Sequence, residues 1–447
     1  MNAYRTLAYD GDFGSSSHTI TYRTVSCMTE SSDIAGGVDV HSRILVASIL
    51  NGERYETRDF NASARGYLEL GEWFLENDCP RVLFEATGVY WYQLFLVLSG
   101  MLEVVVANPW HIKCIPGAKT DKRDSRWLAL VCQKRLANPS RVFTGDYHEF
   151  RESTRQRRTL VKMRTALKNR VHRSLQLCGI KLANVFTDCF GKKGKIILEA
   201  MLQGEPLDDI LKDKKLKLTK EKKQGLREAI QDKLDPVSIL GIERNLRMIE
   251  YLDEQIKISE AEIARKGNPW KKELRILSSI PGVGTLSAHL ILSEIGDIQD
   301  FKTGDQLASY YGLAPTVYQS AGKNHTGHIT KHGSPHMRWI LGQVAHIIAK
   351  MKDNKLGEFY QKKKEQKGSG IAAVATARKL LCLIHHLLIN NEPYQENNQT
   401  KKKRTTKLPE IQATLDLNQA LKIVEKAGYI VNKPDKPKPK RKSLPSG

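Results

Sequence analysis

Hydrophobic and polar positions in the first third of the chain alternate between strand-like and helical spacing. An apolar run in Ile34–Leu50 stops at polar residues and then resumes as alternating strand residues, which predicts a hairpin. Helical spacing follows in Ala64–Asn77 and again in Tyr90–Leu98, and short buried-strand patterns occur at 81–85 and 102–107. Strands that alternate with helices in this way predict an α/β layer structure with a parallel component.

The spacing becomes helical in the middle of the chain. Residues 151–173 form a predicted basic amphipathic helix, and Ile242–Ile263 keeps apolar spacings of three, four or seven. The two segments predict a long helical pair or partial coiled coil. A Lys-rich stretch at 212–223 interrupts them, and it is either a solvated loop or a nucleic-acid contact.

A tight turn between two helices is predicted in Leu277–Gly296. Gly282 and Gly284 flank a single valine there, as a helix-hairpin-helix requires when backbone N–H groups at a helix N-terminus contact a DNA phosphate. A plain helical turn with a glycine cap is the alternative.

Charge changes this picture most. The 447 residues include 71 Lys and Arg against 49 Asp and Glu, a surplus of 22 positive charges that indicates a polyanionic partner, with nucleic acid first. No run of 18 apolar residues occurs, which predicts the absence of a membrane span. Seven cysteines without a CxxC pair argue against disulfides and a zinc knuckle, so we expect a reducing cytoplasm. With nucleic acid as the expected partner, we also expect association with the nucleoid.

Four carboxylates stand out against the basic background. Asp39 lies between valines in a predicted strand, and Glu85 ends another strand pattern. Asp121 and Asp124 begin a predicted helix at three-residue spacing, so both project from one helical face. Such a set could hold two divalent ions, Mg²⁺ or Mn²⁺, around a phosphodiester. Taken one at a time, the acids could instead be helix-start or capping residues.

The segment from Gln306 to Lys352 contains no acid at all. It is cationic and rich in glycine, which favours a loop lying against DNA phosphates, with Lys323, Lys331 and Arg338 as candidate contacts. Ser320 is a candidate nucleophile for such a phosphate. An ordinary turn serine is the alternative.

Together these motifs resemble the DEDD-type insertion-sequence transposases, a family that includes the Piv-like DNA invertases. The motifs are, in order, GVDVH, FEATGVY, KTDKRD, SIPGVG and GLAPTVYQSAGK with GHITKHGSPHMRWIL. The resemblance implies an RNase H-like (RuvC-like) α/β domain with the quartet Asp39, Glu85, Asp121 and Asp124, a helical coiled-coil linker, and a mainly α domain with nucleophile Ser320. It also implies a bridge RNA that pairs with donor and target DNA, a 5′-phosphoserine, and active sites shared between subunits.

We therefore expect a DNA transposase or site-specific recombinase that acts as a homo-oligomer, from dimer to tetramer. The expected parts are an extension at 1–33, the RuvC-like domain at 34–147, a basic helical region at 148–267, the helix-hairpin-helix and serine domain at 268–392, and a basic tail at 393–447. Two alternatives stay open: a RuvC-type Holliday-junction nuclease, and a non-catalytic helix-hairpin-helix scaffold that binds nucleic acid.

Overall fold

The structure is a computed structural model of the chain, and it describes residues 33–113, 121–213, 216–230, 234–320, 323–351 and 354–396. Within these ranges the side chains of 121–123, 317–320 and 323–326 lie outside the description. The extension at 1–32 and the tail from 397 onward also lie outside it. The chain divides into two compact units between Val142 and Phe143, and we describe each by itself.

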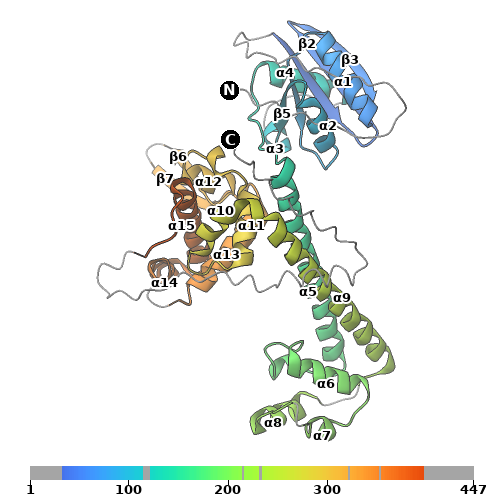
Figure 1. The fold of residues 1–447 in the computed structure, drawn as a ribbon, viewed down its shortest axis with the longest axis vertical. Helices are drawn as coiled ribbons and strands as arrows, with labels where there is room; N and C mark the ends of the chain where they lie inside the picture. Colours follow the sequence, from blue (N-terminus) through green and yellow to red (C-terminus); the bar gives the residue numbers. More distant parts are fainter. Residues whose placement is uncertain are drawn as a thin grey trace, which may run out of the picture. The chain divides into compact units, whose positions relative to one another are not determined.

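The first unit contains a five-stranded sheet with helices on both faces (Figure 1). The strand order is β3-β2-β1-β4-β5, in which β1, β2 and β3 are antiparallel neighbours and β4 and β5 run parallel to β1. Its elements are β1 (Ile34–Val40), β2 (Ile44–Asn51), β3 (Arg54–Asn61), α1 (Ala64–Glu76), β4 (Arg81–Glu85), α2 (Trp91–Leu98), β5 (Glu103–Ala107), α3 (Pro109–Lys113) and α4 (Asp121–Gln133).

The two faces of the sheet pack against different helices because successive strand residues point to opposite sides. Val38 belongs to a core that includes residues of α1 and α2. Ala35 and Leu83 belong to a separate core that includes Leu128 and Val131 of α4. The helix α4 therefore covers the face of the sheet toward which Ala35, Gly37 and Asp39 of β1 point.

Gly37 lets α4 lie directly on the backbone of β1. A Cβ atom at this glycine would stand 2.2 Å from the backbone nitrogen of Ala129 and 2.3 Å from the carbonyl oxygen of Ser125. Next to this contact the hydroxyls of Ser48 on β2 and Ser125 on α4, both fully buried, are 2.8 Å apart and hydrogen-bonded. The start of α4 is thus fixed against the sheet by backbone contact and one buried polar pair.

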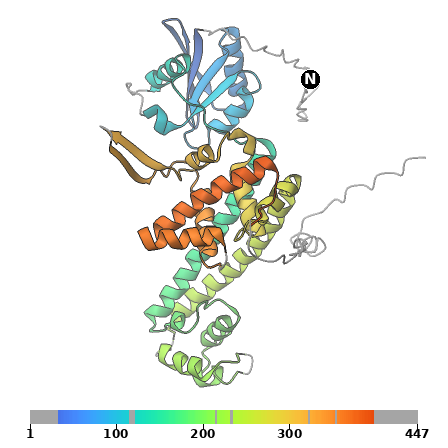
Figure 2. The ribbon, with the colours of Figure 1, turned by 90° about the vertical axis from the view of Figure 1, so that its left-hand side faces the viewer.

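The second unit is built around two long antiparallel helices that lie side by side (Figure 2). Apolar residues of α5 and α9, such as Val171 and Ile249, pack together with residues of the intervening small helices in one core. The elements of this part are α5 (Gly145–Leu177), α6 (Lys192–Leu202), α7 (Leu207–Ile210), α8 (Lys220–Ala229) and α9 (Pro236–Lys266), with a 3₁₀ turn at Leu182–Asn184.

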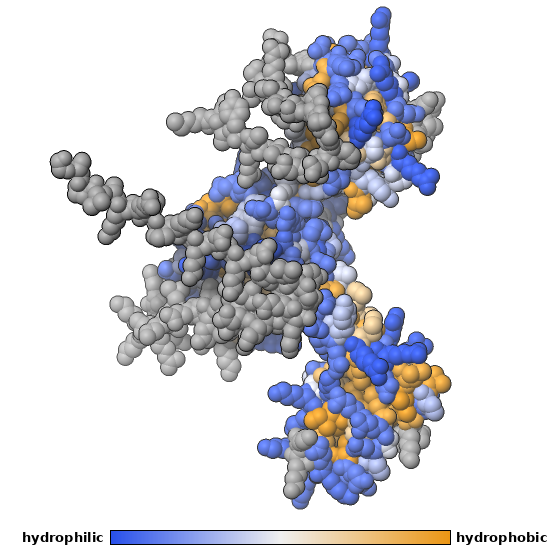
Figure 3. All heavy atoms as spheres, turned by 45° about the vertical axis from the view of Figure 1, so that its right-hand side comes forward, coloured by the Kyte–Doolittle hydropathy of each residue, from blue (hydrophilic) through white to orange (hydrophobic). Residues whose placement is uncertain are grey.

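Apolar residues also gather on the surface near the far end of this helical pair (Figure 3). Leu177 at the end of α5 and Val237 and Leu240 at the start of α9 are among the exposed large side chains. The pair thus has a second, exposed apolar stretch besides its internal core.

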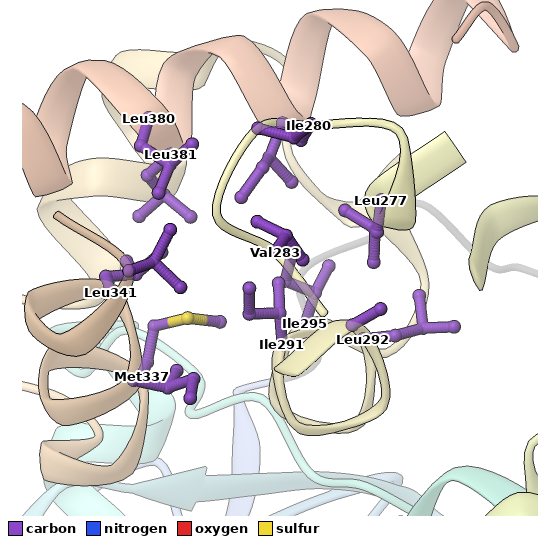
Figure 4. Packing of buried hydrophobic residues seen from close by; sticks show 14 of the residues in the cluster. Leu277, Ile280, Val283, Ile291, Leu292, Ile295, Met337, Leu341, Leu380 and Leu381 are labelled. Carbon is purple, nitrogen blue, oxygen red and sulfur yellow. The ribbon is translucent and has the colours of Figure 1, made fainter. Parts of the chain in front are cut away.

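The rest of the second unit is a helical core that carries a two-stranded ribbon. Leu277, Val283 and Ile291 of the α10–α11 hairpin point toward Leu341 of α13 and Leu381 of α15 (Figure 4). The elements are α10 (Lys271–Ser278), α11 (Thr285–Ile295), α12 (Gly304–Tyr310), β6 (Pro315–Ser320), β7 (Lys323–Ile329), α13 (Pro335–Ile348), α14 (Lys355–Lys367) and α15 (Ser369–Asn390), with 3₁₀ turns at Asn268–Trp270 and Ile298–Asp300.

The helix α15 is long and apolar enough to cross a membrane by length and composition alone. More than half of its apolar window is buried inside the second unit, where Leu380, Leu381 and Ile384 have no exposed surface. Burial of this kind is what the central helix of a bundle requires, and it accounts for the composition of α15.

The architecture confirms the mixed α/β first part and the mostly helical second part that the sequence predicts. Two details differ. The strand β3 was not predicted, because its largely exposed residues lack an apolar face that would mark them. The segment that carries Ser320 is a β-hairpin, whereas the sequence predicted a loop, since Thr316, Val317 and Tyr318 favour extended backbone.

Replacing Gly37 with valine should displace α4 from the sheet. The new side chain would overlap backbone atoms of α4, which cannot move aside as a flexible side chain can, so we expect a loss of about 2–4 kcal/mol in local stability. Hydrogen exchange of the amides in β1 and α4 measures this loss. Gly100→Ala is the control, because a Cβ there would make only an ordinary 3.5 Å contact. Unchanged exchange in α4 would contradict the close approach.

Candidate active site

Two of the predicted acids stand at the carboxyl ends of neighbouring parallel strands. Val38 pairs with Phe84 in the parallel β1–β4 register. Asp39 and Glu85 are the next residues of the two strands, so they lie side by side. Because side chains alternate, both are directed to the face of the sheet that α4 covers. Asp39 is 3.0 Å from Nε2 of His41, which lies just beyond the end of β1.

Asp124 brings a third carboxylate to this edge from the first turns of α4. Its position is set by Ser125, which is hydrogen-bonded to Ser48 on the sheet. Burial raises the pKa of the Glu85 carboxyl above its ordinary value, and the negative charges of Asp39 and Asp124 raise it further. A hydrogen bond from Thr87 and the charge of Lys113 oppose the shift in this pKa. The charges of Asp39 and Asp124 therefore both reach the carboxyl of Glu85.

This donor set fits a hard divalent cation. Carboxylate oxygens are the ligands that Mg²⁺ and Mn²⁺ prefer, and a partly buried group of like charges is relieved by a cation between them. Asp121 begins α4 three residues before Asp124, and its side chain lies outside the described residues. Among the side chains that are described, no group of three His, Cys, Asp or Glu is close enough to form a metal site by itself.

The second part of the predicted site belongs to the other unit. Ser320 ends β6 and pairs with Lys323, the first residue of β7, so both stand where the two strands of the hairpin meet at its tip. Their side chains lie outside the described residues. The four acids and Ser320 are therefore divided between the two units of the chain.

The base of the Ser320 hairpin is a close backbone contact. Gly312 and Gly333 both have positive φ, at +66° and +78°. A Cβ at Gly312 would stand 2.1 Å from the carbonyl oxygen of His332, and one at Gly333 would stand 2.0 Å from that of Tyr310. Only glycine fits either position without a shift of the backbone.

Arg338 closes the same base from α13. Its Nη1 donates hydrogen bonds to the carbonyl oxygens of Tyr311, His332 and Gly333 at 2.9–3.1 Å. The sequence predicted a nucleic-acid contact for this arginine, and the structure gives Nη1 a role in holding the two ends of the hairpin together. Lys331, the other predicted contact in this segment, is exposed, with a positive φ of 57°.

A buried carboxylate that the sequence analysis did not single out lies behind this base. Glu294 on α11 is 3% exposed, and it accepts two hydrogen bonds from Arg155 on α5 and one from Arg151. Although burial raises the pKa of Glu294, these arginines and a hydrogen bond from Ser334 hold it below its ordinary value. The available signal was a lone acid inside the apolar helix Thr285–Ile295.

Much of the charge on the predicted basic helix is paired within the protein. Besides the two arginines that bind Glu294, Arg157 bonds to Glu260 and Arg164 bonds to Asp253, both on α9. The sequence counted these side chains toward a polyanionic partner. In the structure they join α5 to α9 and α11.

The predicted helix-hairpin-helix turn has the expected backbone. Gly282 has a φ of +83°, and Gly284 is the N-cap of α11. The turn packs on the end of α13, where a Cβ at Gly282 would approach Ile348 to 3.0 Å. Gly284 and Thr285 are exposed, so the start of α11 is accessible to a ligand. This accessibility is compatible with a phosphate contact and also with a plain glycine-capped turn.

Comparison with known proteins gives two family matches. Residues 36–180 match the DEDD-type transposase model of the IS110 group, and residues 274–361 match the model described as "Transposase IS116/IS110/IS902 family". The first match includes all four predicted acids. The second includes the helix-hairpin-helix turn and the Ser320 hairpin.

Three named relatives extend over most of the chain. The transposase for insertion sequence element IS1111A of Coxiella burnetii is 26% identical over 66% of this chain and 73% of its own length. A probable family 20 transposase of Pseudomonas aeruginosa is 25% identical over 71% of this chain and 81% of its own. The pilin gene-inverting protein of Moraxella lacunata is 23% identical, covering 74% and 88% respectively.

Replacing Glu85 with glutamine should stabilise the first unit at neutral pH when divalent ions are removed. The folded state raises the pKa of this carboxyl above the ordinary 4.5, so stability falls as pH rises through the raised pKa. We expect the variant to unfold a degree or two higher than the parent in chelator, with the difference vanishing toward pH 4.5. Thermal unfolding against pH measures this, and the exposed Glu72→Gln is the control. A less stable variant at neutral pH would contradict the clustering of the acids.

Replacing Arg338 with methionine should loosen the hairpin at its base. Three carbonyl oxygens lose a charged donor, which predicts a loss of about 2–3 kcal/mol in the local stability of the hairpin. Hydrogen exchange of the amides in 315–329 measures it, and Arg338→Lys should recover part of the protection. Arg378→Met is the matched control, since Arg378 is paired with Asp305 away from this base. Equal exchange in both methionine variants would exclude the role of Arg338.

Proposed function

We propose that this chain is a DEDD-type transposase of the IS110/IS116 family, a DNA recombinase in which Ser320 cuts and rejoins strands with help from a divalent metal ion. The two family-model matches and the relatives described above support this proposal. The main support for the metal site is that Asp39, Glu85 and Asp124 lie at one edge of the sheet. The negative charges of Asp39 and Asp124 both raise the pKa of Glu85. Asp121, at the start of the same helix, completes the proposed set.

The topology of the first unit supports an RNase H-like, or RuvC-like, assignment. Three antiparallel strands followed by two parallel ones, in the order β3-β2-β1-β4-β5, bring Asp39 on the central strand β1 next to the end of β4. A helix against the same face then adds Asp124. This arrangement supports a site for Mg²⁺ or Mn²⁺, which supplies Lewis-acid polarisation of the scissile phosphate when it is bound.

In the proposed reaction the chain's own groups hold and attack a DNA phosphate. The Ser320 hydroxyl oxygen forms a bond to phosphorus and releases its proton, while the bond from phosphorus to the 3′ oxygen breaks and that oxygen takes up a proton. A 5′-phosphoserine and a free 3′ hydroxyl result. Attack by the 3′ hydroxyl of the exchanged strand then reverses these changes, releases Ser320 and joins the new strand.

Further parts of the proposal concern partners. A bridge RNA that pairs with donor and target DNA, and a homo-oligomer of two to four chains acting near the nucleoid in the cytoplasm, extend the family assignment to this protein. Active sites shared between subunits suit a chain whose acids and serine belong to different units. Lys323, Lys331 and the exposed turn at Gly282 and Gly284 stay candidate contacts to nucleic acid.

One observation favours a second candidate function. The acids cluster within the first unit, so that unit could cleave a Holliday junction with water as the nucleophile and with Ser320 uninvolved. Such a RuvC-type nuclease would form no covalent bond to DNA, which separates the two candidates experimentally.

Replacing Ser320 with alanine should abolish a covalent protein–DNA adduct that survives denaturation. With the hydroxyl removed no phosphoester bond can form, whereas Asp124→Asn should weaken adduct formation by about a hundredfold or more through loss of metal-assisted stabilisation. Gel separation of labelled donor DNA after denaturation measures both. The control is Ser309→Ala, an exposed serine on α12 of the same unit.

The outcomes separate the candidates. Adduct formation by Ser320→Ala would move the nucleophile to another residue. Strand cleavage without any adduct in the parent protein would favour the nuclease, and normal strand exchange by Asp124→Asn would exclude the metal-site assignment.

A further inference from the structure

Positive charge is concentrated among few acids in the last third of the described chain. Between Gln306 and Asn391 there are 12 Lys and Arg residues and only three acids, Asp353, Glu358 and Glu365. The helix α15 has no acidic residue at all. This distribution contrasts with α5, where acids on α9 and α11 neutralise several of the arginines.

Two of these cations come together on one aromatic ring. The helices α14 and α15 form an antiparallel pair, and Phe359 on α14 lies between their lysines. The Nζ of Lys363 is 5.9 Å from the centre of the Phe359 ring, and the Nζ of Lys379, on α15, is 4.5 Å from the same point. We call Phe359, Lys363 and Lys379 the Phe359 patch.

Among the described residues, neither ammonium group of the patch has a carboxylate partner. Within the described residues no carboxylate lies within ion-pairing distance of Lys363 or Lys379, and the polar partner of Lys363 is the side chain of Gln366 at 3.5 Å. The neighbouring Arg378 shows the contrast, since it is paired with Asp305 at 3.0 Å. Two like charges on one ring repel each other unless an anion lies near both.

The helical positions place further cations beside the patch. Lys362 precedes Lys363 on α14, and Lys367 lies one turn beyond it on the same face; both are exposed and lack an acidic partner among the described residues. Lys367 also stands in the last turn of α14, where a cation complements the helix dipole, so it has a local reason to be there. Lys363 and Lys379 contact the ring of Phe359, and neither lies in the last turn of a helix, where the helix dipole would account for its position.

We propose that the Phe359 patch binds the phosphate backbone of the DNA on which this protein acts, as a contact that positions duplex DNA without reading its sequence. This inference rests on the proposed function for the presence of DNA as substrate, and it is independent of the nucleophile and the metal site. Lysine ammonium groups contact phosphates as point charges, and their attachment to a ring lowers the entropy lost when DNA binds.

Duplex DNA fits the patch better than a small anion does. A single phosphate would need an enclosed site with several converging donors, whereas Lys363 and Lys379 lie on two helices at the surface with Lys362 beside them. A row of exposed cations from two helices suits a ligand that carries a phosphate at regular intervals. The absence of acids over the whole of α15 removes repulsion along the same surface.

The test is the salt dependence of DNA affinity in the full-length protein. Fluorescence anisotropy with a short labelled duplex, from 50 mM to 200 mM salt, gives the slope of log affinity against log salt. Lys363→Gln with Lys379→Gln should reduce the magnitude of this slope by about 1.8 and weaken binding roughly tenfold or more near 150 mM salt, equally for unrelated sequences. Lys363→Arg with Lys379→Arg should retain the parental slope.

The matched control removes two paired cations from the same unit. Lys195→Gln with Arg227→Gln deletes the same charge, but Lys195 is paired with Glu250 and Arg227 with Asp208, so the slope should change little. An equal loss in both double variants would mean a general charge effect and would overturn the proposal. An unchanged slope in the patch variant, with its helical circular dichroism intact, would overturn it as well.

Two further measurements separate this proposal from the others. With a structured RNA as the probe, a loss of slope for RNA but not for DNA would overturn the assignment to DNA. The patch variant should still form the Ser320 adduct at saturating DNA and low salt, while Ser320→Ala should keep the parental salt slope. If Ser320 is not the nucleophile, the salt slope of the patch variant still tests DNA binding by the patch. If the patch does not bind DNA, the adduct assay still tests Ser320.

Discussion

The second unit depends on a single buried charge. Glu294 lies in the last turn of α11 with almost no exposed surface, where an unpaired carboxylate would cost several kcal/mol. Arg155 and Arg151 reach it from α5, and Ser334 reaches it from the start of α13. Because breaking a buried pair leaves an uncompensated charge, Glu294 holds α5, α11 and the start of α13 in one arrangement.

The backbone of the same residue links this arrangement to the hairpin. Tyr311 donates its hydroxyl hydrogen bond to the backbone carbonyl of Glu294, and the carbonyl of Tyr311 is one of those that Arg338 holds. The network therefore runs from α5 through α11 to the two glycines at the base of the ribbon. Charges that would be counted as DNA contacts from composition alone serve here as internal supports.

The sequence predicted the first unit more fully than the second, and the reason is physical. Buried strands appear as short continuous apolar runs and amphipathic helices have a helical period, so both could be recognised locally in 34–107. The strand-end positions of Asp39 and Glu85 followed from this pattern. The strand β3 was not predicted because an exposed edge strand has no such pattern. The partners of Arg157 and Arg164 could not be predicted, because they lie about a hundred residues away on a helix whose packing is a tertiary property.

The base of the hairpin that carries Ser320 is held by close backbone contacts and by Arg338, and the length of the hairpin gives the angle at this base a consequence. A six-residue strand such as β6 is about 20 Å long, so a tilt of roughly 3° at the base moves the tip by about 1 Å. In the proposed role of Ser320, a displacement of that size would reduce catalysis by about a hundredfold. The close contacts at Gly312 and Gly333 therefore matter through the angle at which the hairpin leaves its base.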